Sequence, residues 1–282
     1  MSTLHFSTTR AWLSLLDKIR NNGRLTQVRG LQTLEILGNQ TTIEMSRPVI
    51  ISKERKLGYR FMVAEAWWIL TGQNTVETIK SYSRQIERFS DDGIYFSGAY
   101  GPKIVDQLSY IVDTLGKDLY SRQAVINIWR ERPASSKDIP CTLSLQFLVR
   151  ADRLNCIATM RSSDAWLGWV YDVFNFSMLS AYLLELLVRQ APDHPQIASL
   201  RLGELTLTAG SQHLYETDFM NVSKVLDNRS NLYPEVEEVE DTEDLIGYLN
   251  YMKNFDPAGL GLRKPEGFLD ELFTAVYSDG DR

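Results

Sequence analysis

The chain has 282 residues, of which 44% are hydrophobic and 23% charged, and its formal net charge is −6. This composition is ordinary for a globular protein, and the negative charge argues against a general nucleic-acid binder, which usually has a basic surface. Two cysteines cannot build a disulfide framework, and no stretch has the pattern of a signal peptide or of a bilayer-spanning segment. We therefore expect a cytoplasmic protein with free thiols that binds neither membranes nor nucleic acid.

No strong linker interrupts the chain before about residue 228, so a single domain over residues 1–282 is expected. Its core spans about residues 1–230. Residues 235–244 contain seven acidic side chains among ten, a composition typical of a solvated segment rather than a site. The part from about 235 to 282 is therefore interpreted as an acidic linker followed by a helical extension.

The first half of the chain alternates helical and extended patterns. Apolar residues at helical spacing predict a helix over 9–22, and a stretch rich in Thr, Leu, Ile and Val predicts two or three strands over 24–50. A nearly all-apolar run predicts a helix over 59–70. A second helix is expected from about 74 to 89, and a third is expected to follow and end at Leu115.

The second half carries the clearest strand signals. A strand is expected over 123–129, and a hairpin is expected from strands over 142–149 and 154–160. A polar loop then leads to a long apolar helix over 174–188, and a further strand runs towards residue 215. Mixed helices and strands in this order predict an α+β fold.

Cys141 opens the first strand of the hairpin, and an Arg-Ser-Ser-Asp cluster closes the second. A thiolate is the nucleophilic form of cysteine, and a nearby Arg161 would lower the pKa of the Cys141 thiol. The alternative is an inert cysteine in the core, which is the interpretation adopted for Cys156. The Arg-Ser-Ser-Asp cluster is itself either an anion binder or a capping loop, because Ser and Asp favour helix starts.

Glu65 lies in the middle of the apolar run over 59–70. A carboxylate in such a run is costly unless it is hydrogen-bonded or exposed. Burial would raise its pKa and would suit it to proton transfer near neutrality. The alternative is a surface glutamate on the polar side of the helix.

Several separated motifs together resemble the catalytic core of the thymidylate synthase family. They are Pro140-Cys141, Gln146-Phe147, Arg161-Ser162-x-Asp164 and Leu167-Gly168. The resemblance covers roughly residues 29–215. It implies a thymidylate synthase fold, with a large mixed β-sheet flanked by helices and one sheet face forming a homodimer interface.

The resemblance also implies roles for individual residues. Catalytic roles fall on Cys141, Glu65, Tyr100 and Asp164, and Trp68 would lie near the cofactor. His213 and Tyr215 would bind the sugar 3′-hydroxyl. The phosphate ligands implied are Arg161, Ser162, Arg29 in a shortened loop and Arg122 from the partner subunit, where Gln123 replaces a usual second arginine.

Asp172 stands where thymidylate synthases have a base-reading Asn, and this substitution resembles the dCMP hydroxymethylase branch of the family. An ionised carboxylate is an acceptor only, so it pairs with the amino group of cytosine and with a protonated N3. Uracil would place O4 against it, an unpaired contact that costs on the order of 1–3 kcal/mol. Asp172 therefore predicts cytosine over uracil.

The resemblance implies one-carbon transfer from 5,10-methylenetetrahydrofolate to C5 of dCMP, with water completing a hydroxymethyl group and no metal taking part. Such an enzyme fits a bacteriophage that modifies its cytosines. Three alternatives stay open: methylation of dCMP or dUMP, hydroxymethylation of CMP, and a non-catalytic nucleotide-binding protein that retains the pocket.

Overall fold

The computed structural model describes residues 4–5, 8–50, 52, 54–55, 57–83, 85–131 and 135–228. The acidic linker and helical extension expected over about 235–282 lie outside these residues. The described part contains a mixed β-sheet with helices packed against it, which confirms the expected α+β class.

The sheet has the strand order β1-β3-β7-β6-β5-β4, and β2 pairs with β3. Neighbours β3 and β7, β6 and β5, and β5 and β4 are antiparallel, whereas β1 and β3 and the central pair β6 and β7 are parallel. The strands are β1 (Leu4–His5), β2 (Arg24–Val28), β3 (Leu31–Glu44), β4 (Val125–Asn127), β5 (Thr142–Arg150), β6 (Arg153–Asp164) and β7 (Arg201–Tyr215).

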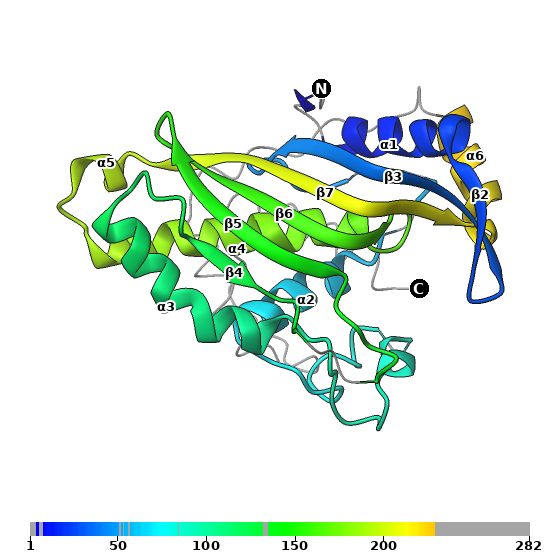
Figure 1. Cartoon of the computed structure of the whole chain (residues 1–282), viewed down its shortest axis with the longest axis horizontal. Coiled ribbons are helices and arrows are strands. Elements are labelled where there is room, and N and C mark those ends of the chain that lie inside the picture. The colour runs from blue at the N-terminus through cyan, green and yellow to red at the C-terminus, as the bar shows by residue number, and fades with distance from the viewer. Residues whose placement is uncertain are drawn as a thin grey trace, which may run out of the picture.

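The helices are α1 (Thr8–Asn22), α2 (Tyr59–Leu70), α3 (Gly101–Lys117), α4 (Trp169–Gln190), α5 (Pro195–Ala198) and α6 (Phe219–Asp227), with short 3-10 turns η1 (Ile86–Phe89) and η2 (Glu216–Asp218). Figure 1 shows α2 and α4 behind the sheet and α3 beside its β4 edge, with no described helix across the face turned to the viewer.

The core lies between the sheet and these helices. Alternate residues of β6, including Leu154, Cys156 and Met160, are buried on the helix side. The central helix α4 is long and apolar enough to cross a membrane, contrary to the sequence-based expectation, but 78% of its apolar window is buried inside the fold. Its apolar character is therefore explained by packing in the core.

Two tight turns have backbone angles that most residues avoid. Arg29 and Gly30 join β2 to β3 with φ values of 51° and 86°, and Ala151 and Asp152 join β5 to β6 with 49° and 55°. Two-residue turns of this hand match the twist of the strands they connect. The first turn places the charged side chain of Arg29 at the tip of a hairpin.

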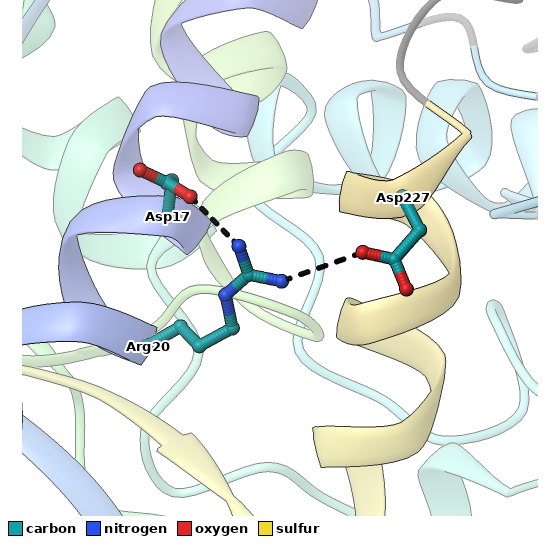
Figure 2. A network of polar contacts seen from close by, with 3 residues as sticks. All are labelled: Asp17, Arg20 and Asp227. Atoms are coloured by element: carbon teal, nitrogen blue, oxygen red, sulfur yellow. Dashed lines mark hydrogen bonds and ion pairs between the residues drawn. The ribbon is translucent and has the colours of Figure 1, made fainter.

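Figure 2 shows an ion-pair network that joins the first and last described helices. The guanidinium of Arg20 on α1 lies 3.0 Å from Asp17 and 3.8 Å from Asp227 on α6. These groups are exposed to solvent, so the network contributes little to stability. It does mark the contact between the two ends of the described chain.

Three sequence-based predictions of local structure are wrong. Residues 74–89 form turns and η1 rather than a helix, because the main chain of Asn74 and Val76 bonds to Phe96 and Ile94 instead of closing helical turns. The loop expected after Met160 is the end of β6, which stays paired with β7 as far as Asp164. Helix α4 begins five residues earlier than expected, at Trp169 rather than at Phe174, so Asp172 lies in its first turn.

Candidate active site

Cys141 immediately precedes β5 in the chain, and its sulfur lies beside the end of β6. The Ser162 hydroxyl is 3.7 Å from this sulfur, and Nη1 of Arg161 donates to the same hydroxyl at 3.0 Å. Arg161 also donates from Nε to the Pro140 carbonyl at 2.9 Å and from Nη2 to the Ile139 carbonyl at 3.0 Å. The guanidinium thus fixes the turn that presents the cysteine.

The environment of Cys141 differs from the sequence-based expectation in one respect. Arg161 and Ser162 do act to lower the pKa of the Cys141 thiol, but burial outweighs them, and Asp172 and Asp138 oppose them further. The net pKa is raised, so the free protein holds mainly the thiol at neutral pH. A proton must leave Cys141 before or during attack.

Asp164 ends β6 and orders the entry to α4. One of its carboxylate oxygens accepts from the main-chain N–H of Trp166 at 2.8 Å and of Leu167 at 3.0 Å. Burial raises the pKa of Asp164, and these two hydrogen bonds oppose the rise. The cluster therefore combines both sequence interpretations, because its Asp caps a turn while its Arg and Ser contact the cysteine.

Asp172 lies in the first turn of α4. The residue keeps some exposed surface, but its carboxyl group is buried and interacts electrostatically with Tyr100 and Glu65. Burial raises the pKa of Asp172 well above its ordinary value, and the charges of Glu65 and Asp164 raise it further. Both effects favour the protonated form over the ionised carboxylate considered from the sequence.

Glu65 faces α4 from the middle of α2. It retains a small accessible surface, yet protein surrounds its carboxylate, and burial raises its pKa to about 7. The side-chain amide of Asn175 donates to Oε2 of Glu65 at 2.8 Å. The interpretation of Glu65 as a surface side chain is excluded, and its pKa suits proton exchange near neutrality.

Tyr100 immediately precedes α3, and its hydroxyl accepts a hydrogen bond from the main-chain N–H of Thr142 at 3.3 Å. This places it one residue from Cys141. Burial is the largest cause of the raised pKa of Tyr100, followed by the charges of Asp172 and Cys141. The phenol is therefore neutral and lies among the same groups.

His213 and Tyr215 end β7 beside β6. Their rings are 5.1 Å apart with an edge-to-face angle of 84°, and His213 pairs in register with Asp164. Burial and Asp164 raise the pKa of Tyr215, whereas the guanidinium groups of Arg29 and Arg161 act to lower it. The positive charges of Arg29 on the β2–β3 turn and of Arg161 on β6 therefore both act on the Tyr215 hydroxyl.

Two predicted site residues lie apart from this cluster in the single chain. Arg122 is exposed ahead of β4, two strands from the strand that carries Arg161. Trp68 is only 7% exposed, donates from Nε1 to Thr78 at 2.9 Å and packs edge-on against Phe96. Their roles in binding phosphate and cofactor stay predictions.

Cys156 is 1% exposed, and burial raises its pKa to about 12, which agrees with its interpretation as a core cysteine. Within the described ranges, no group of three or more His, Cys, Asp or Glu side chains is placed to hold a metal ion.

The family model described as thymidylate synthase matches residues 10–255, and the chain belongs to that family. Members transfer a one-carbon unit from methylenetetrahydrofolate to C5 of a pyrimidine nucleotide. The chain is therefore placed among folate-dependent methyl- and hydroxymethyltransferases that act on pyrimidine monophosphates.

One exposed apolar side chain just after the end of β6 could contact this cosubstrate. Leu167 is 47% exposed although it is apolar, and its main chain is bound to Asp164. An exposed apolar side chain beside buried carboxyl groups fits a flat, partly aromatic pterin. When bound, methylenetetrahydrofolate supplies the electrophilic carbon, and Leu167 would contact its ring.

The sequence-based predictions did not include Asn175. It is 5% exposed on α4, three residues after Asp172, and it contacts Glu65 directly. A signal was present in the sequence, because an Asn between Phe174 and Phe176 in an apolar helix needs a buried hydrogen-bond partner.

Proposed function

We propose that this protein transfers a one-carbon unit to C5 of dCMP and admits water to give 5-hydroxymethyl-dCMP. The observation that carries the proposal is Asp172, a buried carboxyl group that lies close to Tyr100, Glu65 and Cys141. At the base-reading position it replaces the carboxamide that matches uracil.

The protonated form of Asp172 suits cytosine. Its O–H can donate to N3 of the base, and its carbonyl oxygen can accept from the amino group at C4. As the Cys141 thiolate adds to C6, the proton passes from Asp172 to N3. This leaves a neutral adduct whose N3–H donates to the Asp172 carboxylate. N3 of cytosine is a much stronger base than O4 of uracil, so this transfer favours cytosine.

The other groups divide the remaining tasks. Addition of Cys141 to C6 makes C5 nucleophilic, and so replaces one difficult step with two easier ones. Arg161, Ser162 and Arg29 would bind the phosphate, because guanidinium groups stay charged and offer paired donors. Glu65 and Tyr100 exchange protons with the ring and its substituents.

His213 and Tyr215 would bond the 3′-hydroxyl of the sugar, the part of the nucleotide that joins base to phosphate. Asp164 would act by holding the turn that leads to Asp172. Trp68 would support the cofactor side of the site from within the core.

We also propose a homodimer. The face of the sheet opposite α4 is crossed by no helix within the described ranges (Figure 1). A second copy on this face could bring its Arg122 to the phosphate, from which Arg122 of the same chain is remote. The expected location is the cytoplasm, in a phage-infected host if the protein is phage-encoded.

Mass spectrometry of the reaction products tests this function. Purified protein is incubated with methylenetetrahydrofolate and, separately, with dCMP, CMP or dUMP. A dCMP product heavier by CH2O, with tetrahydrofolate released, is the expected result. A product heavier by CH2, with dihydrofolate formed, would instead identify a methylating enzyme.

A further inference from the structure

Asn175 donates a hydrogen bond to Glu65 and has no assigned role in the proposed reaction. It lies on α4 one helical turn after Asp172, so both side chains project from the same side of that helix. Across from them on α2 is Glu65, whose Oε2 accepts from Nδ2 of Asn175 at 2.8 Å. Glu65 therefore meets a titratable carboxyl group and a neutral donor from one helix face.

The position of Asn175 is unfavourable for a residue with only a packing role. It is 5% exposed between Phe174 and Phe176, which are themselves buried. Its Oδ1 is buried and has no hydrogen-bond partner within the described residues. A buried amide with one half unpaired costs stability, and an apolar side chain would fill this position at lower cost.

We propose that Asn175 is a positioning residue for Glu65, holding Oε2 as an acceptor and thereby directing the catalytic proton to Oε1. This inference rests on the proposed function for its catalytic meaning, but the contact itself is a property of the folded chain. A donor at Oε2 disfavours protonation of that oxygen, so a proton on Glu65 resides on the other one.

The electrostatics agree with this assignment. Burial raises the pKa of Glu65, whereas the hydrogen bond from Asn175 acts to lower it and leaves it at about 7. The charge of Glu65 contributes to the raised pKa of two titratable groups, Asp172 and Tyr171, both on α4. Asn175 does not titrate, so replacing it changes the environment of Glu65 without adding or deleting a charge.

The test measures the titration of Glu65 directly. Protein carrying isotope-labelled glutamate is titrated by NMR, and the Glu65 carboxyl signal is assigned by its loss in Glu65→Gln. Asn175→Leu removes the donor and keeps the volume, while Asn175→Ala provides a second variant if the first does not fold. Ser177→Ala is the matched control, because Ser177 is buried on the same helix and bonds only the Val173 carbonyl.

We expect the Glu65 midpoint to rise by roughly half to one pH unit in the Asn175 variants and to stay fixed in the Ser177 control. In the pH profile of product formation, the inflection due to Glu65 should move by the same amount. An unchanged midpoint, or an equal rise in the control, would overturn the proposal. Inactivity of the unaltered protein towards every pyrimidine nucleotide would instead refute the proposed function, and the NMR result would still decide the role of Asn175.

Discussion

The Ser162 hydroxyl oxygen lies 3.7 Å from the Cys141 sulfur, where the end of β6 runs beside the start of β5. Because Arg161 donates to the same hydroxyl, Ser162 can direct its own hydrogen towards the sulfur. The contact stabilises the thiolate against the opposing effect of burial. It therefore links the anion-binding cluster to the nucleophile.

Replacing Ser162 by Ala should slow alkylation of Cys141. Loss of this hydrogen bond raises the pKa of the thiol further, and alkylation at fixed pH near neutrality should fall by roughly 2- to 10-fold. The rate is measured with iodoacetamide in a Cys156→Ser background. Ser163→Ala is the control, since Ser163 is buried on the same strand next to Ser162; equal slowing in both variants would contradict the role of Ser162.

Cys141→Ser should abolish exchange of the C5 hydrogen of dCMP while nucleotide binding persists. A serine hydroxyl is a far weaker nucleophile at neutral pH, so addition to C6 fails although the phosphate and sugar contacts remain. Tritium release reports exchange, and calorimetry reports binding. Exchange that continued in this variant would exclude covalent catalysis by Cys141.

The stability of the protein should depend on pH through Glu65. Its pKa rises from 4.5 in the unfolded chain to about 7 on folding, so the folded protein binds more protons in that interval. Its free energy of unfolding therefore falls as pH rises from about 4.5 to 7. Glu65→Gln removes this pH dependence. The free energy of unfolding of the variant should therefore exceed that of the unaltered protein by as much as roughly 3 kcal/mol above pH 7.

Urea unfolding at several pH values measures this difference. Glu87→Gln serves as the control, because it makes the same change at an exposed glutamate. A pH-independent difference for Glu65→Gln would mean that its carboxyl group is ionised at no cost in the fold.

Arg29→Asn should weaken substrate binding without damaging the hairpin. Asn followed by Gly30 is the preferred pair for a turn in which both residues have positive φ, so the backbone is retained or improved. Removal of the guanidinium should raise the KM for dCMP by roughly 10-fold with little change in kcat. Steady-state kinetics and thermal unfolding together test this, and an unchanged KM would remove Arg29 from the phosphate site.

The sequence predicted the central elements well because their patterns were strong. Helix α2 matched the apolar run containing Glu65, and the β5–β6 hairpin matched two strand patterns separated by charged residues. Cys141, Arg161 and Ser162 were correctly brought together because the hairpin alone determines their proximity.

Features that depend on tertiary contacts could not be predicted in the same way. Asp164 has a polar loop pattern but is held in β6 by its pairing with β7. The raised pKa of Asp172 follows from its burial and from the charges of Glu65 and Asp164, which lie on other elements. The hydrogen bond from Asn175 to Glu65 depends on the packing of α4 against α2, which the sequence pattern does not specify.

The most direct test of the central claim compares kcat/KM for dCMP and dUMP in the unaltered protein and in Asp172→Asn. A carboxamide cannot transfer a proton to N3 of cytosine, but it can donate to O4 of uracil and accept from its N3–H. We expect the unaltered protein to prefer dCMP and the variant to prefer dUMP, with a change in the ratio of roughly 100-fold or more. A variant that kept the preference for dCMP would contradict the assignment of base recognition to Asp172.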